Sequence, residues 1–338
     1  MSASTESGLK RARTGLPAFL RAPEWGLVVG IGAVLGVIYL LNTTGSFFQP
    51  RNRVNLVHNI ALFGVLSLGA AVVIIAGGID LSVGSVVALC GVVGARLTTE
   101  WLPGASAGAE VPPAVIAGAV ALTLLLGLAI GLFHALLISV LRLPPFIATL
   151  ATMAGLRSAA RLACGDRSIN VNAETFQMLG RDNIYTVSIF AIAAVAMSVM
   201  MGATVLGRHL YALGGNEAAA RLSGLPVGRL KSAAYGISGM LSALGGILFT
   251  GNTGQAQGTM GVSYELFAIT AAVVGGCSLA GGVGSIRGTV LGLVLIQFVI
   301  NGTGLTITWI DSTQIEGLVL GTVVVLAVAF NQRFRRRG

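Results

Sequence analysis

Charged side chains are scarce in this chain of 338 residues: Asp, Glu, Lys and Arg make up 10% of it, against about 25% in ordinary soluble domains. Lysine is the scarcest, because Lys10 and Lys231 are the only two. Neither follows the glycine of a G-x-x-x-x-G-K-[ST] motif, which excludes a P-loop ATP site. The patterns HExxH and G-x-S-x-G are also missing, so two common hydrolase sites are excluded. The chain carries no recognisable motor and no cofactor motif of its own.

Cysteine and aromatic residues are also sparse. The three cysteines, Cys90, Cys164 and Cys277, are an odd number and are dispersed in apolar segments without a CxxC pair. This pattern excludes a disulfide framework and a metal cluster, and it predicts small buried hydrophobic residues.

The formal net charge of +9 does not indicate a nucleic-acid partner, because the basic residues are scattered and are not interleaved with aromatic ones.

Apolar residues and glycine are abundant instead. Hydrophobic residues make up 54% of the chain and glycine contributes 48 residues; the mean hydropathy is +0.86. These values predict an all-α polytopic membrane protein with close helix packing, signalled by Gly26-x-x-x-Gly30, Gly32-x-x-x-Gly36 and Gly127-x-x-x-Gly131. The apolar runs predict about ten transmembrane helices near 25–41, 56–76, 82–98, 114–141, 146–164, 185–206, 232–250, 264–280, 287–300 and 315–331.

The distribution of Lys and Arg predicts the topology. With ten spans and the N-terminus inside, most basic residues fall on the cytoplasmic side, as the positive-inside rule requires, although Arg51 and Arg53 fall outside. We therefore expect a cytoplasmic N-terminal tail at 1–24, a transmembrane domain at 25–331 with a cytoplasmic loop at 207–231, and a basic cytoplasmic C-terminal tail at 332–338. Residues 1–24 lack the apolar core of a cleavable signal peptide.

The stretch "GGIDLSVGS" at 77–85 interrupts one apolar run just before the next begins. A broken helix leaves backbone groups that can line a polar cavity, and many transporters build sites in this way. Asp80 is also well placed to cap the following helix, with Ser82 and Ser85 close by. Two interpretations therefore stay open: a pathway or gating element, and a tight cytoplasmic turn with a structural cap.

A second stretch, "GGCSLAGGVGS" at 275–285, repeats the pattern of paired glycines, a leucine and a final Val-Gly-Ser. It matches the first copy with two residues inserted and no acidic residue. Matching glycine breaks in two halves of a chain point to a transporter core. The two copies run parallel rather than inverted. We therefore interpret the match as a local structure that occurs twice, not as proof of a duplication.

Two further polar positions lie within apolar runs. Pro144 and Pro145 predict a short turn followed by a helix, on which Thr149 either lines a polar route or bonds back to its own helix. His134, in "GLFHALL", is either an interhelical hydrogen-bonding residue or part of a transport site.

The most hydrophilic internal stretch is "ALGGNEAAARLSGLPVGR" at 212–229. Asn216 is placed as an N-cap, Gly224 as a C′ glycine, and Glu217 with Arg221 as an i, i+4 ion pair. These features predict a short capped helix over 216–223. Such a helix, held between two spans, is either a lever that passes motion to the membrane helices or an ordinary cytoplasmic loop.

Taken in order, "GGIDLSVGS", "PPFIATL", "ALGGNEAAARLSG" and "GG-x-SLAGG-x-G" resemble the motifs of the membrane permeases of bacterial ABC sugar importers. This group includes the ribose, xylose, arabinose, galactose and autoinducer-2 permeases, and the resemblance runs from about residue 45 to the C-terminus. It implies the type II ABC importer transmembrane fold and a permease domain over 25–331. It leaves the particular sugar open.

The resemblance also implies roles for individual residues. Those that match the cytoplasmic segment docking onto the ATPase are Gly215, Asn216, Glu217, Ala218, Ala219, Arg221, Leu222, Ser223 and Gly224. Those assigned to the translocation pathway or its gating are Gly77, Gly78, Asp80, Ser82, Ser85, Thr149, Gly275 and Gly276.

The resulting hypothesis is a permease subunit, without enzymatic activity of its own, in the bacterial inner membrane with both termini cytoplasmic. The implied partners are a second copy of the chain, a sugar-type ABC ATPase with two cassettes in one chain that binds the ATP, a periplasmic solute-binding protein, and a monosaccharide or neutral polyol. The lipid bilayer surrounds it, and no nucleic acid or metal is involved. The alternatives are a gradient-driven secondary transporter of a small neutral solute and a non-transporting scaffold that binds an ATPase.

Overall fold

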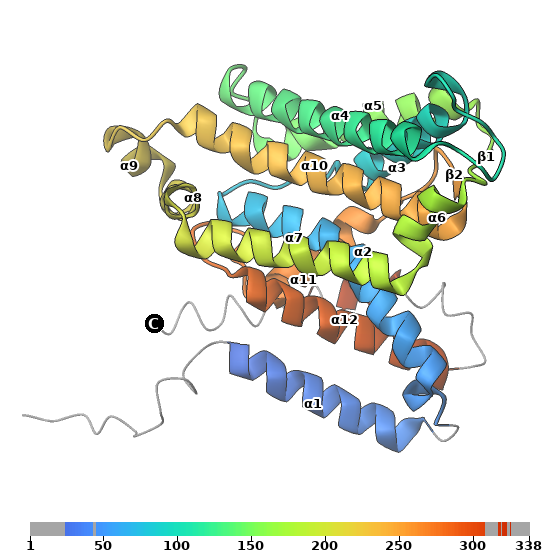
Figure 1. Cartoon of the computed structure of the whole chain (residues 1–338). Coiled ribbons are helices and arrows are strands. Elements are labelled where there is room, and N and C mark those ends of the chain that lie inside the picture. The colour runs from blue at the N-terminus through green and yellow to red at the C-terminus, as the bar shows by residue number, and fades with distance from the viewer. Residues whose placement is uncertain (1–23, 43–44, 308–316, 319, 323–324, 326–338) are drawn as a thin grey trace, which may run out of the picture.

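Helices make up nearly all the secondary structure in the computed structural model, which describes residues 24–42, 45–307, 317–318, 320–322 and 325 (Figure 1). In chain order the elements are α1 (Glu24–Leu41), the 3-10 turn η2 (Ser46–Phe48), α2 (Pro50–Ile75), α3 (Val83–Arg96), the π-helical turn η3 (Leu97–Trp101), α4 (Pro113–Ser139), α5 (Pro145–Cys164), β1 (Ile169–Asn170), α6 (Glu174–Arg181), α7 (Asn183–Ala203), α8 (Val205–Gly215), α9 (Glu217–Leu222), α10 (Val227–Thr253), β2 (Gln255–Ala256), α11 (Tyr264–Val274) and α12 (Ile286–Thr306).

Six helices in the described part of the chain are long and apolar enough to cross a membrane: α2, α3 with η3, α4, α7, α10 and α12. The first nine predicted apolar runs each coincide with a helix, but α11 ends at Val274 rather than near 280 because Gly275 and Gly276 interrupt it. The predicted span 315–331 and both predicted tails lie almost wholly outside the described residues. A multi-pass helical membrane protein is confirmed, and the count of ten stays a prediction.

Proline sets the start of three helices. Pro50, Pro113 and Pro145 occupy the first turn of α2, α4 and α5, where the missing N–H has no helical partner and the fixed φ suits the helix. The turn and helix predicted from Pro144 and Pro145 are confirmed.

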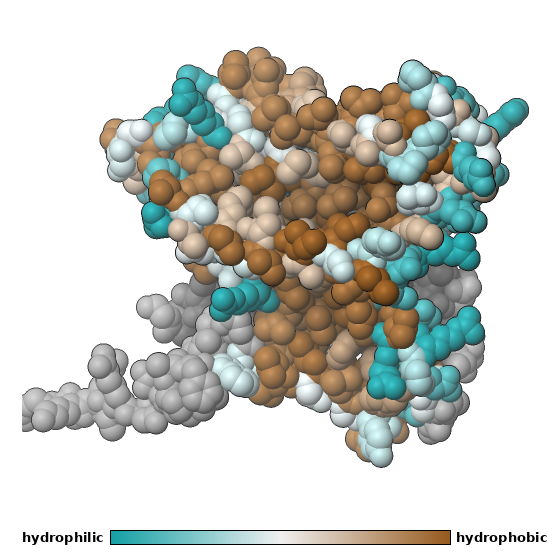
Figure 2. Space-filling model, viewed as in Figure 1, coloured by the Kyte–Doolittle hydropathy of each residue, from teal (hydrophilic) through white to brown (hydrophobic). Residues whose placement is uncertain are grey.

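The helices differ sharply in how far they are covered. In the most apolar window of α2, 83% of residues are buried, whereas the corresponding figure for α7 is 11%. Helices α3 and α10 are also largely covered, with 78% of the window buried in each, so α2, α3 and α10 form the centre and α7 presents most of its apolar surface outwards. The space-filling view shows this surface as an apolar belt with hydrophilic residues gathered mainly at its two ends (Figure 2). A belt of this kind suits contact with lipid hydrocarbon.

The two ends of the bundle carry different structures. One, which we call the α9 end, holds α8, α9, the start of α10 and the turn between α4 and α5 (Figure 1). The other, the ribbon end, holds α6 and an antiparallel pair in which β1 residues Ile169 and Asn170 face Ala256 and Gln255 of β2.

Glycine allows α4 and α10 to touch along their backbones. A Cβ on Gly131 would lie 2.1 Å from the carbonyl oxygen of Tyr235, and one on Gly127 would lie 2.4 Å from that of Gly239. The predicted close packing is therefore confirmed for Gly127 and Gly131. It is wrong for the four α1 glycines, which have no neighbouring atom within 4 Å of an added Cβ among the described residues.

Candidate functional site

Residues 76–82, the first break, separate α2 from α3. Gly77 ends α2 with φ +82°, a left-handed conformation that glycine adopts without a steric penalty. The chain then turns inward, so that Asp80 is only 3% exposed. Both interpretations from the sequence stay open, because a buried carboxyl group fits a gating element and also a turn with a structural cap.

Asp80 is held by two neighbouring elements. One carboxyl oxygen accepts hydrogen bonds from the backbone N–H of Ser82 at 2.9 Å and from its hydroxyl at 2.6 Å. The other accepts a hydrogen bond from the hydroxyl of Ser238 on α10 at 2.8 Å. Satisfied bonds of this kind are what allows a carboxyl group to be buried. Ser82, the residue before α3, is thus fixed by Asp80, and Ser85 donates to the Ser82 carbonyl at 2.7 Å.

The carbonyl of Ile79 is bonded to two other helices. Thr149 of α5 donates to it at 3.2 Å and Tyr235 of α10 at 3.4 Å. Thr149 also donates to the Pro145 carbonyl at 2.9 Å, so the predicted bond back to its own helix is present as well. Gly78 has to be small, because a Cβ there would lie 2.4 Å from the Tyr235 hydroxyl. The first break is consequently fastened to both α5 and α10.

Residues 275–285, the second break, separate α11 from α12. Gly275 packs against α12, where a Cβ would lie 2.4 Å from the Gly288 carbonyl oxygen, and Gly276 has φ +94°. Ser278 accepts a hydrogen bond from the N–H of Ala280 at 3.2 Å, and Ser285 caps α12 by accepting one from Gly288 at 2.9 Å. The second break is built from turns and a cap, without a buried acid.

The two breaks meet at Gly214, in the last turn of α8. A Cβ on Gly214 would lie 1.9 Å from the carbonyl oxygen of Ile75 and 2.6 Å from the backbone nitrogen of Gly282. Gly281 closely approaches both Gly77 and Gly214, and the N–H of Gly282 donates to the Ile75 carbonyl at 2.9 Å. This three-way contact of backbones, the glycine junction, lies two residues before the N-cap of α9.

Helix α9 has the caps that the sequence predicted. The Asn216 side chain accepts a hydrogen bond from the N–H of Ala219 at 3.0 Å. At the other end Gly224 has φ +79°, and the N–H groups of Gly224 and Leu225 donate to Arg221 and Ala220, a Schellman motif. The short capped helix is confirmed. Its Leu222 side chain is 91% exposed, which leaves an apolar residue free at the tip of this segment.

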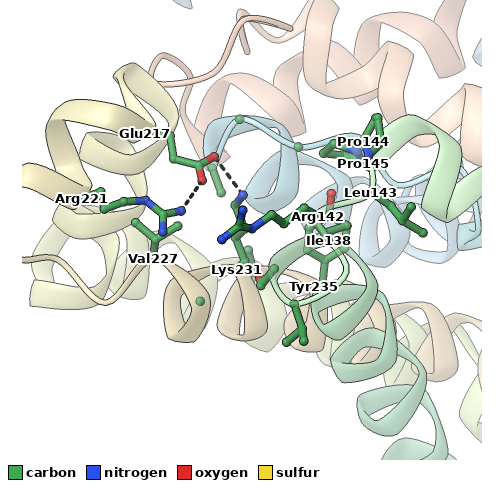
Figure 3. A pocket seen from close by; sticks show the side chains of 17 residues that line it. Ile138, Arg142, Leu143, Pro144, Pro145, Glu217, Arg221, Val227, Lys231 and Tyr235 are labelled. Atoms are coloured by element: carbon green, nitrogen blue, oxygen red, sulfur yellow. Dashed lines mark hydrogen bonds and ion pairs between the residues drawn. The ribbon is translucent and has the colours of Figure 1, made fainter.

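Glu217 ties α9 to α10. One carboxylate oxygen pairs with Arg221 at 3.1 Å, as predicted, and the other pairs with Lys231 of α10 at 2.8 Å (Figure 3). The Lys231 side chain is 16% exposed, against 67% for Arg221, so its ion pair is less screened by solvent. Partial burial alone would raise the pKa of Glu217, but hydrogen bonds and charge from Lys231 and Arg221 outweigh it and hold this pKa below its ordinary value.

A cavity of about 880 Å³ opens beside this ion pair. Its walls come from the first break, the α4–α5 turn, α9 and α10, and Figure 3 shows Arg142 and Lys231 directed towards the same space. Gly77, Gly78 and Tyr235 contribute to its lining. The cavity is thus lined by both α9 and the first break.

His134 does not make the interhelical hydrogen bond that the sequence suggested. It is fully buried, yet neither ring nitrogen has a hydrogen-bond partner among the described residues. Its ring instead packs edge-on against Tyr235, with the centroids 6.3 Å apart. The three cysteines are free and buried, as predicted. No group of three His, Cys, Asp or Glu residues that could hold a metal occurs within the described part of the chain.

The structure thus brings the two predicted glycine breaks together with the segment before α9. Sequence reasoning missed the residues that join them: Gly214, Lys231, Tyr235 and Ser238. Gly214 belongs to a Gly-Gly pair within the stretch already singled out, and Lys231 is one of only two lysines. Tyr235 and Ser238 carry no local signal, because their roles depend on the packing of α10 against the first break.

Comparison with known proteins gives a consistent result. Residues 52–328 match the family described as "Branched-chain amino acid transport system / permease component". The chain is 37% identical to the ribose import permease protein RbsC of Escherichia coli (strain K12) over 310 residues, which cover 89% of this chain and 92% of the relative.

Two other relatives are similar over nearly the same extent. The galactose/methyl galactoside import permease protein MglC of Escherichia coli (strain K12) is 32% identical over 319 residues, covering 91% of this chain and 94% of the relative. The inner membrane ABC transporter permease protein YjfF of the same strain is 34% identical over 313 residues, covering 89% and 91%. No solved structure matches the chain.

Proposed function

Because the chain belongs to the family of permease components of the branched-chain amino acid transport type, we propose that it is the membrane permease subunit of an ATP-driven importer for a monosaccharide or related neutral polyol. As a permease component, it transports without an ATPase site of its own. The relatives are named for ribose and galactose import, whereas the family description names branched-chain amino acids. The choice of cargo therefore needs its own support.

The scarcity of charge in the apolar helices favours a neutral cargo. An amino acid carries both an ammonium and a carboxylate group, and each needs charged or strongly polar partners when it leaves water. Both carboxyl oxygens of Asp80 are already bonded to serines. A monosaccharide needs only hydroxyl and backbone partners, which suits a pathway of small polar and apolar groups.

The observation that carries the mechanism is the glycine junction. Gly214 contacts both breaks and lies immediately before Gly215, Asn216 and the capped helix α9. We infer that ATP-driven closure of partner ATPases displaces α9, and that the displacement reaches the breaks and switches the cavity between outward- and inward-open states. The segment from Gly215 to Gly224 is the coupling segment in this proposal, with the exposed Leu222 as its apolar contact.

The remaining predicted site residues fit gating better than cargo binding. Gly77, Asp80, Ser82, Ser85 and Thr149 lie in or against the first break, and nearly all are buried within a single chain. Residues so enclosed cannot line an open route through one copy. In a dimer of two permeases, movement of the two breaks, with Gly78, Gly275 and Gly276 as hinges, would open or close the route between copies.

Charge supports placing the α9 end in the cytoplasm of a bacterial inner membrane. Arg142, Arg221, Arg229 and Lys231 belong to the α4–α5 turn, α9 and the start of α10, which share this end. This is the clustering expected of cytoplasmic loops. It supports a permease domain at 25–331 with cytoplasmic tails at 1–24 and 332–338 and a coupling loop at 207–231. The outer ribbon end would then receive a periplasmic solute-binding protein, while the ATPase, with two cassettes in one chain, binds beneath α9.

A gradient-driven secondary transporter is the second candidate. One buried carboxyl oxygen, on Glu265, favours it. Oε2 of Glu265 is buried without a hydrogen-bond partner in the described residues, and intramembrane acids serve as coupling sites in such transporters. Asp80 is less suited, because its bonds to Ser82 and Ser238 already occupy it.

Reconstitution in proteoliposomes separates the candidates. The permease is inserted with and without its cognate ATPase and binding protein, and uptake of labelled ribose and galactose is measured with ATP, with an ion gradient, or with neither. We expect uptake that requires ATP, the ATPase and the binding protein. Uptake driven by an ion gradient alone would contradict the proposal, and so would the absence of any uptake by a correctly assembled complex tested with a panel of neutral sugars.

A further inference from the structure

Helix α10 connects the coupling segment to the first break through three side chains. Lys231 pairs with Glu217 of α9 at 2.8 Å, Tyr235 donates to the Ile79 carbonyl at 3.4 Å, and Ser238 donates to the Asp80 carboxyl at 2.8 Å. These residues stand at i, i+4 and i+7, a spacing that places them along one face of a helix. One stripe of α10 therefore touches both α9 and the first break.

We propose that α10 transmits the displacement of α9 to the first break through Lys231, Tyr235 and Ser238. This α10 connection is separate from the glycine junction on α8. The inference rests on the proposed function, since it assigns the elements that carry its conformational signal. It names Lys231, Tyr235 and Ser238 as positioning residues. None of the three was assigned a role from the sequence.

The backbone of α10 is closely packed against α4 where the contacts of Tyr235 and Ser238 lie. Gly131 of α4 meets the Tyr235 carbonyl and Gly127 meets the Gly239 carbonyl so closely that a Cβ at either glycine would overlap the oxygen. The helix runs without interruption from Val227 to Thr253. An unbroken helix passes a displacement at its start along its length, whereas a hinge would absorb it.

The contacts at the two ends of the stripe both involve a carboxylate group. Lys231 is largely buried and pairs with the Glu217 carboxylate, which is a charge-assisted bond. Ser238 bonds a carboxyl group that is itself fixed to Ser82, the residue before α3. A shift of α10 therefore moves Asp80, and Asp80 moves the start of α3.

The experiment is a double-mutant cycle on the coupling ratio, the number of solute molecules imported per ATP hydrolysed. Lys231→Met removes the link to α9, and Ser238→Ala removes the link to Asp80. The two positions are seven residues apart, about 10 Å along the helix axis, so direct contact does not couple them. We expect each variant alone to lower the coupling ratio by about two- to thirtyfold.

The double variant gives the decisive result. If both links belong to one route, breaking the second adds little once the first is broken, and the double variant resembles the worse single variant. If the two effects multiply, the links act separately and the proposal is overturned. It is equally overturned if both single variants keep the wild-type coupling ratio.

Matched controls separate transmission from folding. Arg53→Met removes an exposed cation of α2, outside the coupling loop, that forms no ion pair with the described residues, and Ser67→Ala removes a buried hydroxyl that donates to the Phe63 carbonyl of its own helix. Both are expected to keep the coupling ratio, and Lys231→Arg is expected to restore it. Coupling lost equally in the controls would contradict the proposal.

A substitute variant and a wild-type measurement keep the test interpretable. If Ser238→Ala is not recovered from the membrane, Tyr235→Phe replaces it, because that change removes only the hydroxyl bonded to Ile79. Wild-type uptake in the same vesicles reports on the proposed function. If wild-type uptake needs no ATP, the proposed function is contradicted. If wild-type uptake needs ATP while the α10 variants keep the wild-type coupling ratio, only the proposed α10 connection is contradicted.

Discussion

The two breaks use the same local structure but are attached to different neighbours. In the first, Asp80 accepts a hydrogen bond from the N–H two residues later; in the second, Ser278 does the same. Asp80 also reaches Ser238 of α10. The second break has no bond to α10 of this kind; α8, which also contacts Gly77 of the first break, holds it through the Tyr211 hydroxyl, which donates to the Gly284 carbonyl at 2.9 Å, and through Gly214.

The difference teaches that a buried carboxylate fixes the first break, whereas the second break depends mainly on close packing of glycine backbones. Helices α8 and α10 flank α9 on either side in the chain. One coupling segment is therefore connected to both breaks, through a glycine contact on one side and through hydrogen bonds on the other. Changes that insert volume test the first connection, and changes that remove polar atoms test the second.

The largest effect is expected from Gly214→Val. Its Cβ would lie 1.9 Å from the Ile75 carbonyl oxygen, which belongs to a backbone that cannot move aside freely, and overpacking of this kind costs at least about 1–3 kcal/mol. We expect a large loss of folded protein and of uptake. Gly215→Ala is the matched control, because an added Cβ there has no atom within 4 Å. Equal melting temperatures in detergent for these two variants would contradict the glycine junction.

A comparable loss of stability is expected from Asp80→Leu, which leaves the N–H and hydroxyl of Ser82 and the hydroxyl of Ser238 without their acceptor. Each unsatisfied buried group costs about 1–3 kcal/mol, whereas a single lost hydrogen bond costs about 1 kcal/mol. Ser278→Ala, the corresponding change in the second break, should therefore destabilise much less, and Asp80→Asn should lie between them. Thermal unfolding of the purified variants measures the order; a reversed order would remove the distinction between the breaks.

The smallest effect is on the titration of Glu217. Because its pKa in the folded protein is held below the ordinary value, the stabilisation from its ion pairs is present above the ordinary pKa and is lost as pH falls through the lowered one. Carbon-13 NMR of labelled glutamate, assigned with Glu217→Gln, measures this pKa. Lys231→Met should raise it, whereas Arg229→Met should not. An unchanged pKa in Lys231→Met would show that the α9–α10 attachment does not persist in solution.

Much of this arrangement could be predicted from local sequence. The caps of α9, the Glu217–Arg221 pair and the helix start at Pro145 all depend on residues close together in the chain, so their chemistry is readable there. The two glycine breaks were visible for the same reason. Their meeting at Gly214 was not, because it depends on how α2, α8 and α11 pack across long sequence separations.

Polar partners in the core were the least predictable feature. Of the two alternatives for His134, the interhelical hydrogen bond is absent among the described residues, where the ring packs against Tyr235. Asp80 was placed as a pathway residue or a cap for the next helix, and its bond to Ser238 of α10 was not foreseen. Serine is common and gives no periodic signal of its own, so only the fold identifies which serine completes the site.

The most direct test of α9 as the coupling element is a charge swap read as solute imported per ATP hydrolysed. Glu217→Lys with Arg221→Glu keeps an ion pair within α9 but sets the introduced ammonium group against that of Lys231, and adding Lys231→Glu restores an opposite charge on α10. We predict that the double variant inserts and assembles but imports poorly for the ATP it consumes, and that the triple variant recovers much of the import. A double variant that couples as well as the wild type would contradict the account.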